Sequence, residues 1–146
     1  MSHHFVIRVV GKLLIPFILL FGLYVQFHGD FGPGGGFQAG VIFAAAFVLY
    51  ALIYGVDKAR EVLPDSVLRV GAGLGVLIFG GTGVASVLLD ANYLDYGPLA
   101  HDTPHGQHVG IFVVEFGVGV TVASVMAILF FLFADRGGHD EMDEER

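Results

Sequence analysis

Residues 109–134 read VGIFVVEFGVGVTVASVMAILFFLFA, an apolar run with one ionisable side chain, Glu115. The hydrocarbon core of a bilayer is about 30 Å thick, and about 20 apolar residues cross it as an α-helix. This run is long enough to do so. Three further stretches, residues 5–27, 37–56 and 67–89, are also apolar and long enough to cross the bilayer. The sequence therefore predicts an all-α integral membrane protein, a bundle of four transmembrane helices.

The composition argues against a water-soluble domain. Of the 146 residues, 55% are hydrophobic and 14% are charged, whereas charged residues make up about 25% of a soluble domain. A chain this short cannot bury so much apolar surface in one core. The formal net charge of −7 argues against nucleic-acid partners, which require clustered basic residues.

The residue types also limit the chemistry. The chain has no cysteine, which excludes disulfides, thiolate zinc sites and cysteine-bound iron–sulfur clusters. No nucleophile–base pair stands out, so we expect neither an enzyme acting alone nor a cofactor. The spacing of His101, His105 and His108 would suit a metal on one helix face, but we favour simple polar loop residues and predict no metal site.

The basic residues predict the orientation. The connections at 28–36 and 90–108 contain no Lys or Arg. All seven basic residues lie on the other side of the predicted membrane: Arg8, Lys12, Lys58, Arg60, Arg69, Arg136 and Arg146. By the positive-inside rule both termini are cytoplasmic. We therefore expect a multi-pass cell-membrane protein with a transmembrane domain at 1–134 and an acidic cytoplasmic tail at 135–146.

Glycine is unusually frequent. It makes up 22 of the 146 residues, about 15%, whereas its typical share is about 7%. Gly71 and Gly75 form a small-xxx-small pair, as do Gly36 and Gly40. Because glycine lets two helix backbones approach closely in lipid, we favour tight helix packing. The alternative is that residues 80–83 (GGTG) break the third helix and expose carbonyl groups to an ion.

Glu115 is the main functional candidate. It would lie about 9 Å into the fourth helix if the helix starts at Val109, and about 16 Å if it starts at Pro104. A carboxylate at that depth has one of two roles. It relays protons or cations, or it forms a structural hydrogen bond or ion pair. Lys12 would lie about 10 Å into the membrane from the cytoplasmic side, opposite to the side from which Glu115 enters. In a core about 30 Å thick, the depths of the two groups should therefore differ by a few ångströms. Lys12 is thus a candidate partner, although we favour snorkelling to the interface.

Residues 28–40 read HGDFGPGGGFQAG. This stretch resembles the Pro-Gly-Gly-Gly-Phe signature that opens the second helix in the MnhB family, a family of membrane subunits of Mrp-type multisubunit Na⁺/H⁺ antiporters. The matching residues are Pro33, Gly34, Gly35, Gly36, Phe37 and Gly40. The fourth span is similar too, with Glu115 before Phe116-Gly117-Val118. Many family members have Asp in place of Glu115 and Gly in place of Ala39.

The resemblance implies a membrane subunit of an antiporter complex that exchanges Na⁺ for H⁺, driven by the proton-motive force. Its implied partners are the other subunits, membrane lipid, Na⁺ and H⁺. The candidates for an ion pathway are Glu115, Lys12, His28 and Asp30. Two alternatives remain: a non-conducting scaffold that holds other subunits through glycine-rich helices, and a subunit of a related complex such as a membrane-bound hydrogenase.

Overall fold

The computed structural model describes residues 2–29 and 34–144, with side chains over 5–29 and 34–135. Within these residues it is helical and contains no strand. The elements are α1 (Ser2–His28), α2 (Gly36–Tyr54), α3 (Val56–Val62), α4 (Asp65–Leu88), the 3₁₀-helix η1 (Gly97–Leu99) and α5 (Thr103–Glu144).

Four of these helices are long and apolar enough to cross a membrane: Phe5–His28, Gly36–Tyr54, Asp65–Leu88 and Thr103–Asp135. The four predicted spans are therefore confirmed. The last helix starts at Thr103 rather than Val109, with Pro104 in its first turn, where the fixed φ of proline suits helix entry. The two short helices, α3 and η1, were not predicted from the sequence.

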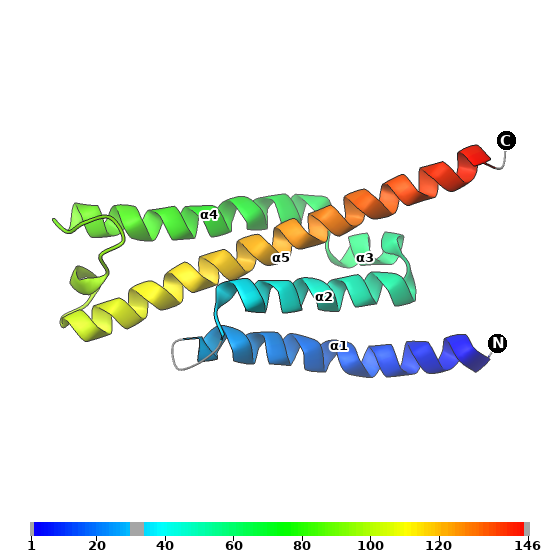
Figure 1. The fold of residues 1–146 in the computed structure, drawn as a ribbon, viewed down its shortest axis with the longest axis horizontal. Helices are drawn as coiled ribbons and strands as arrows, with labels where there is room; N and C mark the ends of the chain where they lie inside the picture. Colours follow the sequence, from blue (N-terminus) through cyan, green and yellow to red (C-terminus); the bar gives the residue numbers. More distant parts are fainter. Residues whose placement is uncertain (1, 30–33, 145–146) are drawn as a thin grey trace.

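The four long helices lie side by side in the order α1, α2, α5, α4 (Figure 1). The main contacts run from α1 to α2, from α2 to α5 and from α5 to α4. The two helices in the middle of this layer therefore each have a neighbour on both sides, and the outer two have one. The start of α1 and the end of α5 lie at the same end of the molecule, as four spans require (Figure 1).

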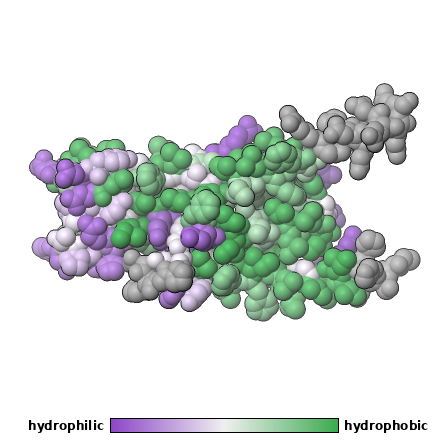
Figure 2. All heavy atoms as spheres, in the orientation of Figure 1, coloured by the Kyte–Doolittle hydropathy of each residue, from purple (hydrophilic) through white to green (hydrophobic). Residues whose placement is uncertain are grey.

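Small residues form the contacts of the central helix α2. Its buried residues are Gly36, Ala39, Gly40, Ala44, Ala46 and Ala51. In lipid no hydrophobic force drives helices together, and small residues let their backbones pack closely. Most bulky residues of α2 are half-buried, and Phe37 and Leu52 are exposed. Figure 2 shows hydrophobic side chains over most of this face, with hydrophilic ones gathered at the end that carries the α4–α5 connection.

A small core anchors α3 at the opposite end. Ala59 of α3 is buried with Leu68 of α4 and with Ala127 and Phe131 of α5. This cluster fixes the short helix between α2 and α4, at the end where the termini lie (Figure 1). Beyond Asp135 the backbone of α5 continues as helix to Glu144, so the acidic tail is helical over residues 135–144.

The helix break considered for residues 80–83 is not present. The α4 helix runs unbroken from Asp65 to Leu88. Thr82 Oγ1 donates a hydrogen bond of 2.8 Å to the carbonyl of Ile78 within the same helix. Helix packing, the interpretation that we favoured, accounts for Gly71 and Gly75, whereas a Cβ atom on Gly73, Gly80 or Gly81 would have no atom within 4 Å.

Candidate functional site

The carboxylate of Glu115 lies against the connection between α1 and α2. A Cβ atom placed on Gly29, just after α1, would lie 2.8 Å from Glu115 Oε2. A Cβ atom placed on Gly35, just before α2, would lie 3.1 Å from Glu115 Oε1. The two features that the sequence reading singled out separately, the acid of the fourth span and the glycine motif, therefore form one site.

Glycine is required here because backbones touch. A Cβ atom on Gly36 would collide with the carbonyl oxygen of Glu115 and lie 3.0 Å from the amide nitrogen of Gly119. One turn later, a Cβ atom on Gly40 would lie 2.6 Å from the carbonyl oxygen of Gly119. The predicted small-xxx-small pair Gly36–Gly40 thus packs the first turns of α2 directly on the backbone of α5.

The start of α2 also provides a favourable electrostatic position for an acid. Gly35 is the N-cap residue, with φ of 122°, a conformation that glycine adopts readily. Its N–H donates to the carbonyl of Val25 at 3.3 Å, which folds the connection back onto α1. The N-terminus of a helix carries a partial positive charge from the helix macrodipole, so it favours a nearby carboxylate such as Glu115.

The other residues of the motif have different positions. A Cβ atom on Gly34 would lie 2.8 Å from the carbonyl oxygen of Val25, so Gly34 is also held against α1. Phe37 is 61% exposed and points away from the helix layer. Asp30 and Pro33 lie outside the described residues.

Two remaining candidates lie far apart on α1. His28 is half-buried at the end of the helix, and its ring stacks on Tyr24 with 5.1 Å between centroids. Lys12 is exposed and lies sixteen residues earlier, which is about 24 Å along a helix. Glu115 is at the His28 end, so the structure does not bring Lys12 to it. The separation is larger than expected because α5 begins beyond the end of α1, so that Glu115, twelve residues into α5, lies only level with the α1–α2 connection (Figure 1).

Comparison with known proteins identifies the family of this chain. A family model described as a domain related to the MnhB subunit of Na⁺/H⁺ antiporter matches residues 6–128. The chain belongs to the MnhB family. Its relatives include a putative antiporter subunit mnhB2 of Staphylococcus aureus strain MRSA252, 31% identical over 134 residues that cover 91% of this chain and 94% of the relative. The protein of the same name in strain Newman is 33% identical over 135 residues, with the same coverage.

One polar residue of this MnhB-family chain was missed by sequence reasoning. Gln26 is 6% exposed, and a Cβ atom on Gly119 would lie 2.7 Å from Gln26 Oε1. Its amide nitrogen Nε2 is buried and has no hydrogen-bond partner in the part of the chain that the structure describes. The sequence analysis did not single out Gln26, and only its burial in the structure draws attention to it.

The second predicted glycine pair, Gly71–Gly75, packs α4 on α5. A Cβ atom on Gly71 would lie 2.6 Å from Ser124 Oγ, and one on Gly75 would collide with Thr121 Oγ1. Thr121 Oγ1 donates to the carbonyl of Gly117 at 3.0 Å and lies 3.4 Å from that of Ala72. These glycines therefore hold the helices of this MnhB-family chain together internally.

Among the residues with described side chains, no group of three or more His, Asp or Glu residues could hold a metal ion. The triplet His101, His105 and His108 does not gather into such a group.

At the opposite end of the layer, Arg60 of α3 donates to Asp135 of α5 at 2.6 Å. The Arg60 guanidinium also lies over the ring of Phe131, 5.3 Å from its centroid.

Proposed function

We propose that this chain is the MnhB-type membrane component of a multisubunit antiporter that exchanges Na⁺ for H⁺, driven by the proton-motive force. Membership in the MnhB family and four apolar helices support this role. The asymmetry of basic residues supports a position in the cell membrane with both termini in the cytoplasm. The partners of the chain are the other membrane subunits of the complex, lipid, and the two transported ions.

Within this role Glu115 lies on the ion path. Further candidates are His28, which lies at the same end of α1, and Asp30, which is outside the described residues. The observation that carries this assignment is the position of the Glu115 carboxylate beside Gly29 and Gly35, where α1, α2 and α5 meet. A carboxylate can hold either a proton or a cation, the two species that an antiporter exchanges in turn. Lys12, about 24 Å away along α1, takes no direct part and snorkels to the cytoplasmic interface.

The substitution Glu115→Gln tests this assignment, because it keeps the size of the side chain and removes its charge. We expect it to abolish Na⁺/H⁺ antiport in everted membrane vesicles while the subunits still co-purify. Glu115→Asp should keep part of the activity, since it retains the carboxylate. Glu61→Gln, on an exposed acid of α3, is the matched control and should be silent. Full antiport by Glu115→Gln would contradict the assignment.

A second candidate, a non-conducting scaffold, is favoured by the outer face of α4. Cβ atoms placed on Gly73 and Gly80 would have no atom within 4 Å, so these glycines are open to a neighbouring helix. Under this function Gly73→Leu should release other subunits, and Glu115→Gln should leave transport unchanged. Gly75→Leu does not discriminate, because Gly75 packs against α5 within the same chain.

Purification of the complex from native membranes separates the antiporter from a hydrogenase-type assembly. The expected result is co-purification with other membrane-spanning antiporter subunits. Nickel or iron–sulfur subunits in the same complex would instead favour a membrane-bound hydrogenase.

A further inference from the structure

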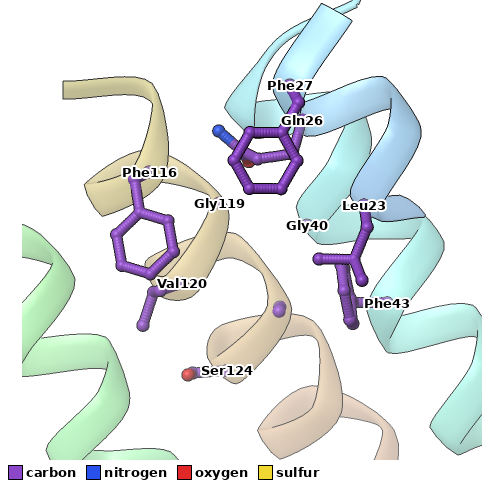
Figure 3. Close-up of a pocket in the computed structure, with 10 residues that line it drawn as sticks. Leu23, Gln26, Phe27, Gly40, Phe43, Phe116, Gly119, Val120 and Ser124 are labelled. Carbon is purple, nitrogen blue, oxygen red and sulfur yellow. The ribbon is translucent and has the colours of Figure 1, made fainter. Parts of the chain in front are cut away.

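Two cavities of similar size differ in the side chains that line them. The first, of about 310 Å³ between α1, α2 and α5, is lined by apolar side chains such as Phe27, Phe43 and Phe116 and by no charged one (Figure 3). The second, of about 280 Å³, lies between α3, α4 and α5. Its charged side chains come from all three helices: Arg60, Asp65, Arg69 and Asp135. Of the two, the second cavity is therefore the one that can recognise a ligand by its charge.

The charged cavity lies at the boundary between hydrocarbon and water. Asp65 is the first residue of one membrane span, and Asp135 is the last residue of another. Ile128 and Leu132 also line the cavity, and they lie about 10 Å and 5 Å deeper than Asp135 along α5. Leu132 is 57% exposed. The cavity thus passes from charged groups to an accessible apolar side chain, as a phospholipid passes from its headgroup to its acyl chains.

The balance of charges argues against a simple anion site. The four charged side chains of the cavity are two arginines and two aspartates, so their formal charges cancel. An anionic headgroup would meet the two carboxylates, and a cation would meet the two guanidinium groups. A headgroup with both a phosphate and an ammonium group can place each beside a group of opposite charge. Charge complementarity therefore favours a zwitterionic phospholipid.

Arg69 provides the guanidinium for the phosphate. Its side chain is exposed, and in the described part of the chain its one hydrogen bond runs from Nε to the backbone carbonyl of Asp65, at 3.3 Å. Its two terminal nitrogens can therefore meet a phosphate oxygen. Arg60 is engaged with Asp135 at 2.6 Å, and its own Nε is buried. Asp65 is exposed and Asp135 is 51% exposed, so both carboxylates are accessible to an ammonium group.

We infer that this cavity binds a lipid of the phosphatidylethanolamine type. The phosphate accepts hydrogen bonds from Arg69, and the primary ammonium donates to the carboxylates of Asp65 and Asp135. An acyl chain lies along Leu132. The quaternary ammonium of phosphatidylcholine has no N–H to donate, and the headgroup of phosphatidylglycerol has no ammonium group. The inference depends on the chain spanning a membrane, and neither on Glu115 nor on the transported ions.

A photoactivatable phosphatidylethanolamine, with a diazirine in its acyl chain, tests the site. The protein is purified from native membranes with its associated subunits, reconstituted with this lipid and illuminated, and the adducts are located by peptide mass spectrometry. We expect adducts on residues 128–132 of α5. Unlabelled phosphatidylethanolamine should reduce them about two- to ten-fold more effectively than the same excess of phosphatidylcholine or phosphatidylglycerol, the range for one hydrogen bond.

Matched substitutions test each half of the headgroup. Arg69→Gln should lower the yield of these adducts about five-fold, as for one basic group at a membrane surface. Lys58→Gln removes an exposed basic group that does not line the cavity and should leave the yield unchanged. Asp65→Asn should weaken the preference for phosphatidylethanolamine over phosphatidylcholine, whereas Glu61→Gln, outside the cavity, should keep it. All four residues are exposed, so the amount of the chain in the membrane should not change.

Several results would overturn the inference. Equal competition by all three lipids would show an unselective lipid surface, and stronger competition by phosphatidylglycerol would show a site for anionic lipid. The absence of adducts on residues 128–132 would show that the cavity is closed to lipid. An unchanged yield with Arg69→Gln would remove the phosphate contact on which the site depends.

Discussion

Two carboxylates on α5, Glu115 and Asp135, lie near opposite ends of the helix layer and are held in different ways. Twenty residues separate them, about 30 Å along a helix, which matches the thickness of a bilayer core. No charged residue lies between them in the sequence. Asp135 accepts a hydrogen bond from the oppositely charged Arg60, whereas Glu115 lies against the glycine backbone that leads into α2.

The surroundings of the two carboxylates differ in how much they depend on close packing. The Arg60 and Asp135 side chains are 32% and 51% exposed, so water and salt share their interaction. At the Glu115 end, the first turns of α2 pack on the backbone of α5 at Gly36 and Gly40, where a Cβ atom would collide. A small change of side chain should therefore have little effect at the Asp135 end and a large one at the Glu115 end.

The largest effect is expected from Gly36→Leu. A side chain at this position would collide with the carbonyl of Glu115 and separate α2 from α5. The expected loss of stability is about 3 kcal/mol, the upper part of the range for overpacking. Thermal unfolding in detergent, followed by circular dichroism, measures it. Gly73→Leu, with no atom near its Cβ position, is the control. Equal stability of the two variants would refute the importance of this backbone contact.

A smaller loss is expected from Gly75→Ala on the other side of α5. The new methyl group would meet Thr121 Oγ1 and lie 2.8 Å from the backbone nitrogen of Thr121. Since only one carbon is added, we expect a loss of about 1–2 kcal/mol in the same unfolding assay. Gly80→Ala, in open space on the same helix, should be neutral or stabilising by up to about 1 kcal/mol. The reverse order of the two variants would contradict the assigned contact.

Breaking the ion pair should have a still smaller effect. The hydrogen bond to Asp135 raises the pKa of Arg60, so its guanidinium stays charged throughout the accessible pH range. Asp135→Asn should cost about 0.2–1 kcal/mol, as for other exposed pairs, and high salt should remove most of the difference. A double-mutant cycle with Arg60→Gln measures the coupling. A loss that high salt leaves unchanged would show that the pair acts through packing instead.

The smallest effect involves Tyr96 in the α4–α5 connection, which also lies beside a glycine, Gly110. Burial, with a smaller contribution from Tyr93, raises the pKa of Tyr96 above its ordinary value of 10. The folded chain therefore holds this proton more tightly than the unfolded chain. The stability it provides is complete below pH 10 and declines as the pH rises through the folded pKa. Tyr96→Phe should flatten this alkaline decline, and tyrosinate absorbance should show one fewer late-titrating group.

Much of the fold could be predicted because lipid imposes simple rules. Apolar length indicated the four helices, and glycine spacing indicated the two close contacts of α5, at Gly36–Gly40 and Gly71–Gly75. The short helix α3 was missed because the charges around Lys58 resemble those of a loop. Glu115 was identified as a rare acid in an apolar run.

The site itself depends on tertiary contacts that the sequence pattern does not contain. Glu115 and Gly35 are eighty residues apart in the sequence, and their meeting requires α5 to pack on α2 in one register. Distance from the start of α5 was taken as depth in the membrane, but α5 begins well beyond the end of α1, and this made Lys12 look like a neighbour (Figure 1). Gln26 was missed because burial of a polar group near a span end has no local sequence signal.

The four long helices contact one another mainly in a single row, α1–α2–α5–α4, and a helix with its side chains is about 10 Å across. Such a layer has no interior of its own: each residue is within about one helix diameter of an outer surface. A wall of this kind can separate two compartments and form one side of a channel, but it cannot enclose a channel alone. If Glu115 lies on the ion path that we propose, helices of neighbouring subunits would complete its surroundings.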